Sequence, residues 1–304
     1  MNQNPKVSII VLSLNGEKVI GQCLSSLQKT NYPNLELIVI NNGSTDKTPE
    51  IVSTQFPQVR LINLTENRGF AGGNNVGIQQ SNGVIVILLN DDTEIEPDWV
   101  SAIVNEMQKD KRIGIAGCKI YYPDRKTLQH TGGYINIHGL SVHYGKGELD
   151  NGKYNKLQDV DYVMGSAIAI KREVINKLGL LDEKYYPIYF EETEYCFRAR
   201  KLGYRVVYVP NSIVYHYESQ TTGLGSEGFF QKYHKNRIRF MFKNFTAEQL
   251  ARAIEPELRW LRNIRYSVEL KPAFQAYRYN LLRLPLLLFD RWKYEYHDWK
   301  QRKK

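Results

Sequence analysis

The sequence predicts an α/β protein built on a mostly parallel, Rossmann-like sheet with helices on its faces. Apolar strand-like runs alternate with segments of helical periodicity in the N-terminal third of the chain, and this alternation is typical of parallel sheets. The runs are continuously apolar, as expected of strands that are buried on both faces. The composition of the 304 residues, 42% hydrophobic and 24% charged, is that of an ordinary globular protein.

The first two strand-helix units are defined by their apolar spacing. Residues 6–12 (KVSIIVL) form a β-branched run, and in residues 17–29 the apolar side chains recur at helical spacing. A second buried strand is expected at residues 35–40 (LELIVI). The next helix is expected to begin at Thr48, because Pro49 suits a first helical turn.

The next two units are shorter. A strand is expected at residues 59–63, a helix at 74–80, a strand at 84–89 (VIVILL) and a helix at 96–108. Ligands of such sheets bind at the carboxyl ends of the strands. We therefore expect a ligand site where polar clusters follow the apolar runs.

The second half of the chain is predicted to be less regular and to end in helices. We expect a strand at 113–122, loops and short hairpins at 123–158, an apolar segment at 161–170, helices at 171–178 and 190–202, and a strand at 204–209 that Pro210 closes. From residue 228 the pattern is helical, with expected interruptions at Pro256, Pro272 and Pro285. These segments divide the chain into a main domain, residues 1–240, and a helical tail, residues 241–304.

The positive charge is concentrated in the tail. The net charge of the chain is +9, and residues 241–304 carry 14 Lys or Arg against 7 Asp or Glu. The main domain is therefore nearly neutral, and we expect no nucleic acid partner. A basic tail that holds three of the four tryptophans is typical of binding to an anionic membrane surface. The alternative is a helical appendage packed on the main domain or on a second subunit, which would give a homodimer.

The cysteines and the apolar runs bear on localisation. The three cysteines are widely scattered, so neither a disulfide framework nor a CxxC metal site is expected. The first apolar run, at residues 6–12, is too short for a signal-peptide core. A membrane span needs about 18 consecutive apolar residues, and no stretch of the sequence is that long. We expect a reduced, cytoplasmic protein.

Residues 41–46 (NNGSTD) follow a buried strand and precede a helix. Residues of these types suit a turn and a helix cap. They also offer side-chain acceptors and exposed backbone amides to the base and ribose of a nucleotide. Both interpretations remain open from these residues alone.

Residues 67–75 (NRGFAGGNN) are rich in glycine, which lets backbone approach a ligand closely, and Arg68 is suited to a phosphate. A flexible loop would show the same glycines. The segment lacks the spacings of a dinucleotide fold and of a P-loop.

Asn90, Asp91 and Asp92 come directly after the apolar run at residues 84–89. Two adjacent acids at a strand end are costly to bury without compensation. A hard divalent cation that joins carboxylate to a substrate diphosphate would supply it. The alternative is an exposed turn that caps the next helix.

A third polar cluster, residues 191–194 (EETE), begins the helix expected at 190–202. Clustered carboxylates raise one another's pKa, which suits a general base near neutral pH. The alternative is a solvated acidic first turn, which the helix dipole favours. His216 ends another apolar run, and a lone histidine there is more often structural than a ligand.

In this order the clusters resemble the family 2 glycosyltransferases, which are inverting enzymes with the GT-A fold. The resemblance covers about residues 6–245 and is closest to the bacterial rhamnosyltransferase-like branch of surface polysaccharide synthesis. It rests on the segments VSIIVLSLN, INNGSTDKT, ENRGFAGGNNVGI, LLNDDTEIEPDW, GSAIAIKREV, YFEETEYCFRARKLGYRVVYVP and VYH. Residues 1–240 would then be the catalytic domain.

The resemblance implies a nucleotide-diphospho-sugar donor and a divalent cation, Mg2+ or Mn2+. It places Asp92 and His216 at the metal and Glu192 as catalytic base, where the family pattern has Asp. Asn41 likewise stands where the family usually has Asp. Gly165 and Glu191 would lie on the acceptor side. Donor-binding residues would be Ser13, Asn15, Asn41, Asn42, Ser44, Asp46, Asn67, Arg68, Gly69, Asn74, Asp91, Lys235 and Arg237.

The expected reaction moves a sugar, from dTDP-rhamnose or a UDP-sugar, to a hydroxyl of a saccharide or a lipid-linked acceptor. The protein would then work in the cytoplasm, peripheral to the inner face of the cell membrane. One alternative is a catalytically inactive binding protein with this fold, which Asn41 and Glu192 favour. Another is a nucleotidyltransferase, but residues 13–18 carry no arginine for an activating loop.

Overall fold

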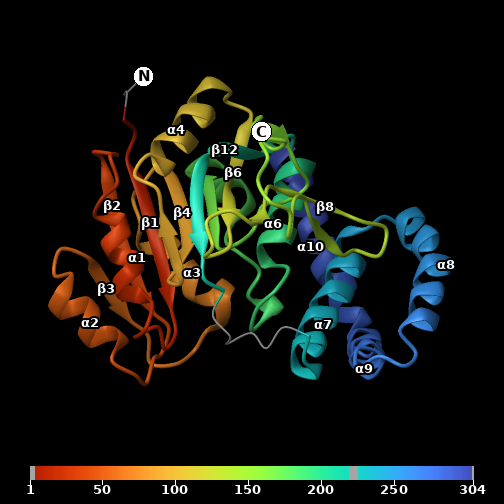
Figure 1. Cartoon of the computed structure of the whole chain (residues 1–304). Coiled ribbons are helices and arrows are strands. Elements are labelled where there is room, and N and C mark those ends of the chain that lie inside the picture. The colour runs from red at the N-terminus through yellow and green to blue at the C-terminus, as the bar shows by residue number, and fades with distance from the viewer. Residues whose placement is uncertain (1–3, 219–224, 303–304) are drawn as a thin grey trace. The chain divides into compact units, whose positions relative to one another are not determined.

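The computed structural model describes residues 4–218 and 225–302, with the side chains of residues 297–299, 301 and 302 left out. Its contacts divide the chain into two compact units. Unit 1 comprises Met1–Tyr134, His143–Pro187 and Glu191–Glu218, and unit 2 comprises Ile135–Val142, Ile188–Phe190 and Ser219–Lys304. Figure 1 shows the chain and labels many of the helices and strands of both units.

Four parallel strands form the N-terminal half of the sheet of unit 1. They lie in the order β4 (Ile85–Asn90), β1 (Val7–Ser13), β2 (Leu35–Asn41) and β3 (Arg60–Asn63). The apolar runs of β1 and β4 are buried in the core, as predicted, and so is the second half of β2, whereas β3 at the edge of the sheet is partly exposed. The register aligns the carboxyl ends, because Ser13 pairs with Asn41 and Asn41 pairs with Asn63. The polar residues after the strands therefore meet at one edge.

Helices α2 (Thr48–Gln55) and α3 (Gly69–Gln80) pack on this half of the sheet, and α1 (Ile20–Leu27) packs beside α2. Helix α4 (Trp99–Lys109) packs mainly on the second half of the sheet. The buried side chains of α1 and α4 recur at helical spacing and join one apolar core with β1 and β4. Pro49 lies in the first turn of α2, as predicted.

The glycine-rich segment is part of a helix. α3 begins at Gly69, before the start that was predicted from the sequence. A Cβ at Gly73 would overlap the side chain of Leu12, and one at Gly77 would overlap that of Ile10. Both glycines therefore let α3 pack closely on β1, and this packing outweighs the low helix propensity of glycine.

The second half of unit 1 extends the same sheet. β11 (Ala167–Lys171) lies antiparallel between β4 and β6 (Ile113–Tyr121), and β12 (Arg205–His216) runs parallel to β6. The prediction that Pro210 ends this last strand is wrong, because β12 continues through an irregularity between Val209 and Ile213. A bulge is one of the places where a sheet accommodates proline.

Shorter elements complete the described chain between residues 93 and 201. They are β5 (Thr93–Ile95), β7 (Leu128–His130), β8 (Gly133–Ile135), β9 (Ser141–His143), β10 (Gln158–Asp159), α5 (Arg172–Leu178), the 3-10 helix η1 (Glu183–Tyr185) and α6 (Glu191–Lys201). Most of them belong to unit 1, and β8 and β9 lie at the ends of residues 135–142, which are assigned to unit 2. The first turn of α6 is acidic and its last turn is basic, which complements the helix dipole.

Unit 2 contains four helices, α7 (Glu227–Asn244), α8 (Ala247–Asn263), α9 (Leu270–Leu281) and α10 (Leu284–Arg302). The expected interruption at Pro256 is wrong, because this proline lies inside α8, whose N-terminus is fixed by a capping box at Thr246. The predicted domain boundary at residue 241 falls inside α7. Among the residues described, no helix is long and apolar enough to cross a membrane.

Candidate functional site

The loops that follow β1 and β2 are joined by hydrogen bonds. The backbone N–H of Asn15 donates to Ser44 Oγ at 2.9 Å, and the N–H of Thr45 donates to Asn15 Oδ1 at 2.9 Å. Asp46 accepts from the N–H groups of Glu17 and Thr48, each at 3.0 Å. Burial would raise the pKa of Asp46, but these bonds and the Thr48 hydroxyl outweigh it and lower the pKa. An ionised Asp46 therefore holds the two loops together.

Asn41 and Asn42 are buried at the end of β2. Asn41 Nδ2 donates to Asn63 Oδ1 at 2.9 Å, a bond that an aspartate could not donate. Asn42 Oδ1 accepts from the N–H of Arg68 at 2.9 Å, and its Nδ2 donates to Asn67 Oδ1 at 3.1 Å. The two asparagines thus hold the end of β3 and the segment before α3 in position through their side-chain hydrogen bonds.

The predicted residues before and within α3 differ in exposure. Asn67 and Arg68 are exposed, and Arg68 lies 3.7 Å from Glu183 in a half-exposed ion pair. Gly69 begins α3 with a φ of 71°, and its N–H donates to Asn67 Oδ1 at 2.8 Å. Asn74 is buried, and its Oδ1 has no hydrogen-bond partner within the described residues. A buried acceptor without a partner is uncommon in folded proteins.

Asp91 lies against the end of β1. Ser13 Oγ donates to Asp91 Oδ2, and a side chain at Gly16 would collide with both groups. Burial, with a further contribution from the neighbouring Asp92, raises the pKa of Asp91 to about 7. The carboxyl is therefore held in a place that favours its neutral form or a neighbouring positive charge.

The side chains of Asp92, which directly precedes β5, and His216, which ends β12, contact each other. His216 Nε2 lies 3.1 Å from Asp92 Oδ1, and both side chains are buried. His216 Nδ1 lies 2.8 Å from Gln129 Oε1, and Gln129 Nε2 donates to Glu218 at 3.1 Å. Gln129 Oε1 can only accept a hydrogen bond, so His216 Nδ1 carries an N–H, and Nε2 is the ring nitrogen that faces Asp92.

The Asp92–His216 pair fits a divalent cation, because it presents one carboxylate oxygen and one imidazole nitrogen to the same place. Among residues 4–218 and 225–302, no group of three or more His, Cys, Asp or Glu side chains is arranged to hold a metal ion. A cation at the pair would take its further ligands from a substrate or from water.

Glu192 lies in the first turn of α6, beside Gly165. A Cβ at Gly165 would come within 3.5 Å of the Glu192 carboxyl carbon and 3.1 Å of the Phe70 ring. Burial raises the pKa of the Glu192 carboxyl. Glu191 is buried at the start of the same helix. The predicted acceptor-side residues Gly165 and Glu191 thus lie near Glu192 in unit 1.

Glu194 has a structural role. Its carboxylate is fully buried and accepts from Arg198 Nε at 2.9 Å, one helical turn further along α6. Within the acidic segment, the carboxylate of Glu194 is therefore fixed in an ion pair, whereas Glu192 is half-buried.

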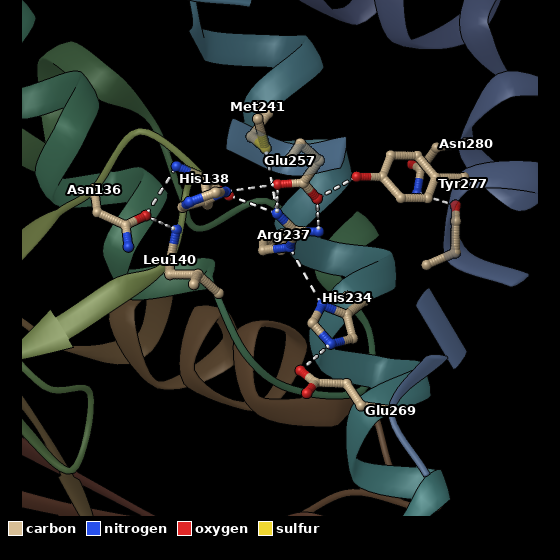
Figure 2. A network of polar contacts seen from close by, with 11 residues as sticks. Asn136, His138, Leu140, His234, Arg237, Met241, Glu257, Glu269, Tyr277 and Asn280 are labelled. Carbon is tan, nitrogen blue, oxygen red and sulfur yellow. Dashed lines mark hydrogen bonds and ion pairs between the residues drawn. The ribbon is translucent and has the colours of Figure 1, made fainter. Parts of the chain in front are cut away.

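Arg237 does not have the role that the sequence predicted. Figure 2 shows that its guanidinium belongs to a network inside unit 2. It contacts Glu257 at 2.6 and 3.2 Å, the His138 carbonyl at 2.6 Å and His234 Nδ1 at 3.2 Å, and its side chain is fully buried. These bonds occupy the N–H donors of Arg237 that a phosphate would need. The prediction that Arg237 binds the donor is therefore wrong. Lys235 is half-buried, with Nζ 5.9 Å from the centre of the Tyr279 ring, and its role stays a prediction.

Two residues were not identified from the sequence. Gln129 orients His216, although it lies far from His216 in the chain. Asn75 binds the backbone of Leu181 through both its amide atoms, each at 3.0 Å, and also donates to Glu183. Both are polar residues next to glycine-rich segments, and only the tertiary contacts reveal what they hold.

Comparison with known proteins shows the family of the chain. The family model "Glycosyl transferase family 2" matches residues 8–179. The chain is 33% identical over 237 residues to "Uncharacterized protein y4gI" of Sinorhizobium fredii, a match that covers 73% of the chain and 26% of that protein. It is 25% identical to an N-acetylglucosaminyl-diphospho-decaprenol L-rhamnosyltransferase of Mycobacterium tuberculosis, over 72% of the chain and 78% of that enzyme.

A solved structure shares the fold. The mannosyltransferase PcManGT of Pyrobaculum calidifontis, in complex with GDP-Man and Mn2+, matches with a TM-score of 0.58 and 19% identity, over 96% of this chain and 74% of that chain. The curated relatives are mostly longer than the chain, which spans 26%, 17% and 53% of three of them.

Proposed function

Because the chain belongs to glycosyl transferase family 2 and has the GT-A fold, we propose that it transfers a sugar from a nucleotide-diphospho-sugar to an acceptor hydroxyl with inversion. The donor would be dTDP-rhamnose or a UDP-sugar. The acceptor would be a saccharide or a lipid-linked saccharide of cell-surface polysaccharide synthesis. The observation that carries the proposal is the buried Asp92–His216 pair, in which His216 Nε2 lies 3.1 Å from Asp92 Oδ1 just after the end of β4.

The donor site would use the exposed and half-buried groups at the strand edge. Side chains that water can reach, such as Asn15, Ser44, Asn67 and Arg68, are available to a base, a ribose or a phosphate. The buried members of the predicted set, Asn41, Asn42, Asn74 and Ser13, would act by holding these loops in place. The solved complex of PcManGT with GDP-Man supports a donor of this chemical class.

Asp92 and His216 would hold a divalent cation, Mg2+ or Mn2+. When bound, such a cation supplies positive charge that stabilises the diphosphate as it leaves. Gln129 would keep His216 in the tautomer that directs Nε2 toward Asp92. Asp91 would remain hydrogen-bonded to Ser13 and keep the strand end in position.

Glu192 would take the proton from the acceptor hydroxyl. Its carboxyl carbon lies close to Gly165, where an added Cβ would come within 3.5 Å of that carbon. A base acts in its ionised form, and burial raises the pKa of Glu192 above its ordinary value of 4.5. Turnover should therefore rise as pH rises through this raised pKa.

The test of the proposal compares wild type, Glu192→Gln and the matched control Glu173→Gln, an exposed glutamate on α5. Release of UDP from UDP-GlcNAc, dTDP from dTDP-rhamnose and GDP from GDP-mannose is followed in the presence of Mn2+, with a lipid-linked saccharide supplied as acceptor. Loss of a general base lowers turnover by about 100- to 10,000-fold. We expect this loss in Glu192→Gln with unchanged nucleotide binding, and no loss in Glu173→Gln.

Two results would count against the proposal. If Glu192→Gln turns over as fast as wild type, Glu192 is not the base. If wild type binds a nucleotide but releases none from any of the three donors in the presence of the acceptor, the result favours an inactive binding protein with this fold.

A further inference from the structure

The side of α10 that faces solvent is apolar. Leu286 is 63% exposed, Phe289 50%, Trp292 59% and Tyr296 52%, and these residues recur at helical spacing. The rings of Phe289, Trp292 and Tyr296 stack in sequence, with centroids 5.9 Å apart. A continuous exposed apolar stripe of this kind marks a binding surface in most proteins.

The opposite side of α10 packs in unit 2 and contains the polar pairs. Leu287 and Asp290 are buried there, and Asp290 forms an ion pair with Arg239 of α7 at 2.9 Å. Arg291 donates to the Phe245 carbonyl at 2.7 Å. The usual arrangement of a surface helix, with charges outward and apolar residues inward, is thus largely reversed.

Cations accompany the exposed apolar residues of α9 and α10. Lys293 Nζ lies 4.5 Å from the Phe289 ring centre, and the Arg283 guanidinium lies 3.9 Å from that of Tyr279. Arg278, Arg283 and Lys293 are exposed and have no carboxylate partner in the part of the chain that the structure describes. Each places a positive charge next to an exposed apolar surface.

The acidic residues of α9 and α10 whose side chains are described leave little negative charge on this surface. Asp290 is buried with Arg239, and Glu295 is paired with Arg291 at 2.8 Å. Exposed aromatic rings and unpaired cations that outnumber the exposed acid, Glu295 (58% exposed), are the chemistry of a helix that lies in an anionic lipid interface. A second copy of this chain is a poorer occupant, because self-association would bring two positive surfaces together.

We infer that the exposed stripe of α10, formed by Leu286, Phe289, Trp292 and Tyr296, binds the surface of an anionic membrane. The exposed Leu281, Leu282, Arg278 and Arg283 at the end of α9 and in the turn after it, and Lys293 on α10, take part in this binding. The aromatic and leucine side chains enter the interface between headgroups and acyl chains, and the three cations contact the lipid phosphates. This binding does not require the transfer reaction. The two proposals can therefore fail separately.

The test is co-sedimentation of the full chain with vesicles of phosphatidylcholine alone and with vesicles of phosphatidylcholine and phosphatidylglycerol. Wild type should sediment with the anionic vesicles, and added salt should weaken this binding. Phe289→Ser/Trp292→Ser should lower the affinity on the order of a hundredfold, because two large apolar side chains no longer enter the interface. Arg278→Gln/Arg283→Gln/Lys293→Gln should lower it about a hundredfold, since each cation contributes about fivefold.

The matched control is Val84→Ser/Leu149→Ser, which removes two exposed apolar side chains from unit 1 and should bind as wild type does. Thermal unfolding of each variant checks that it is folded. The inference is overturned if wild type sediments with neither vesicle, or if the aromatic variant binds as tightly as the control. It is also overturned if sedimentation velocity shows a dimer that the aromatic substitutions dissociate while no vesicle is bound.

Discussion

Replacing Glu257 by Gln should destabilise the protein strongly. Glu257 lies at the centre of the network in Figure 2, where it contacts Arg237, His138 Nδ1 at 2.9 Å and the Tyr277 hydroxyl. Arg237 is fully buried, so the substitution would leave a guanidinium away from water without an opposing charge. Removing one partner of a buried pair costs about 3–5 kcal/mol.

A matched control lies on the same helix. Glu255 pairs with Arg259, but both side chains are more than two-thirds exposed, at 71% and 72%. Exposed pairs contribute about 0–1 kcal/mol, so Glu255→Gln should change the free energy of unfolding by less than about 1 kcal/mol. For a chain of 304 residues a loss of 3–5 kcal/mol corresponds to a fall in Tm of about 5–8 °C.

Differential scanning calorimetry of wild type and the two variants measures the difference. Burial would raise the pKa of Glu257, but the bonds to Arg237, Tyr277 and His138 outweigh it and lower the pKa below its ordinary value of 4.5. The stability from this pair is therefore present above pH 4.5 and is lost as pH falls through the lowered pKa. If Glu257→Gln and Glu255→Gln unfold at the same temperature near pH 7, the reasoning about the buried pair is refuted.

Two further substitutions test the packing and the orientation of the site. Gly77→Ala places a Cβ against Ile10 and should lower the free energy of unfolding by about 1–3 kcal/mol in urea titration. Gly21→Ala, whose added Cβ meets no atom within 4 Å, should stabilise the chain by up to about 1 kcal/mol, and equal effects would contradict the close packing of α3. Gln129→Leu should weaken Mn2+ binding in the presence of UDP by about 10- to 100-fold in calorimetry, because His216 loses its hydrogen-bond partner. An unchanged Mn2+ affinity would remove Gln129 from the site.

The sheet could be predicted because its signal is local. Each buried strand is a continuous apolar run that ends in polar residues, and parallel pairing brings those ends to one edge. The errors fall where tertiary contacts outweigh local propensity. The glycines of α3 are helical because they pack on β1, and Pro210 is accommodated by an irregularity in β12.

Fewer of the residues of the candidate site than of the sheet could be predicted from the sequence. The resemblance to a known family named Asp92 and His216, and the structure brings these two side chains within 3.1 Å of each other. It could not indicate Gln129, because its contact with His216 depends on how distant segments pack. It also assigned Arg237 to the donor, since a sequence does not show that a guanidinium is enclosed by carboxylate and carbonyl groups.

The most direct test of the central claim is calorimetric titration of the chain with UDP, dTDP and GDP, each with Mn2+ and with EDTA. The proposed donor site predicts that at least one nucleotide binds with Mn2+ and that EDTA weakens this binding. The Asp92→Asn variant should lose the dependence on Mn2+ and remain folded. Binding that is indifferent to EDTA would contradict the metal role of Asp92 and His216, and the absence of binding by all three nucleotides would contradict the donor site itself.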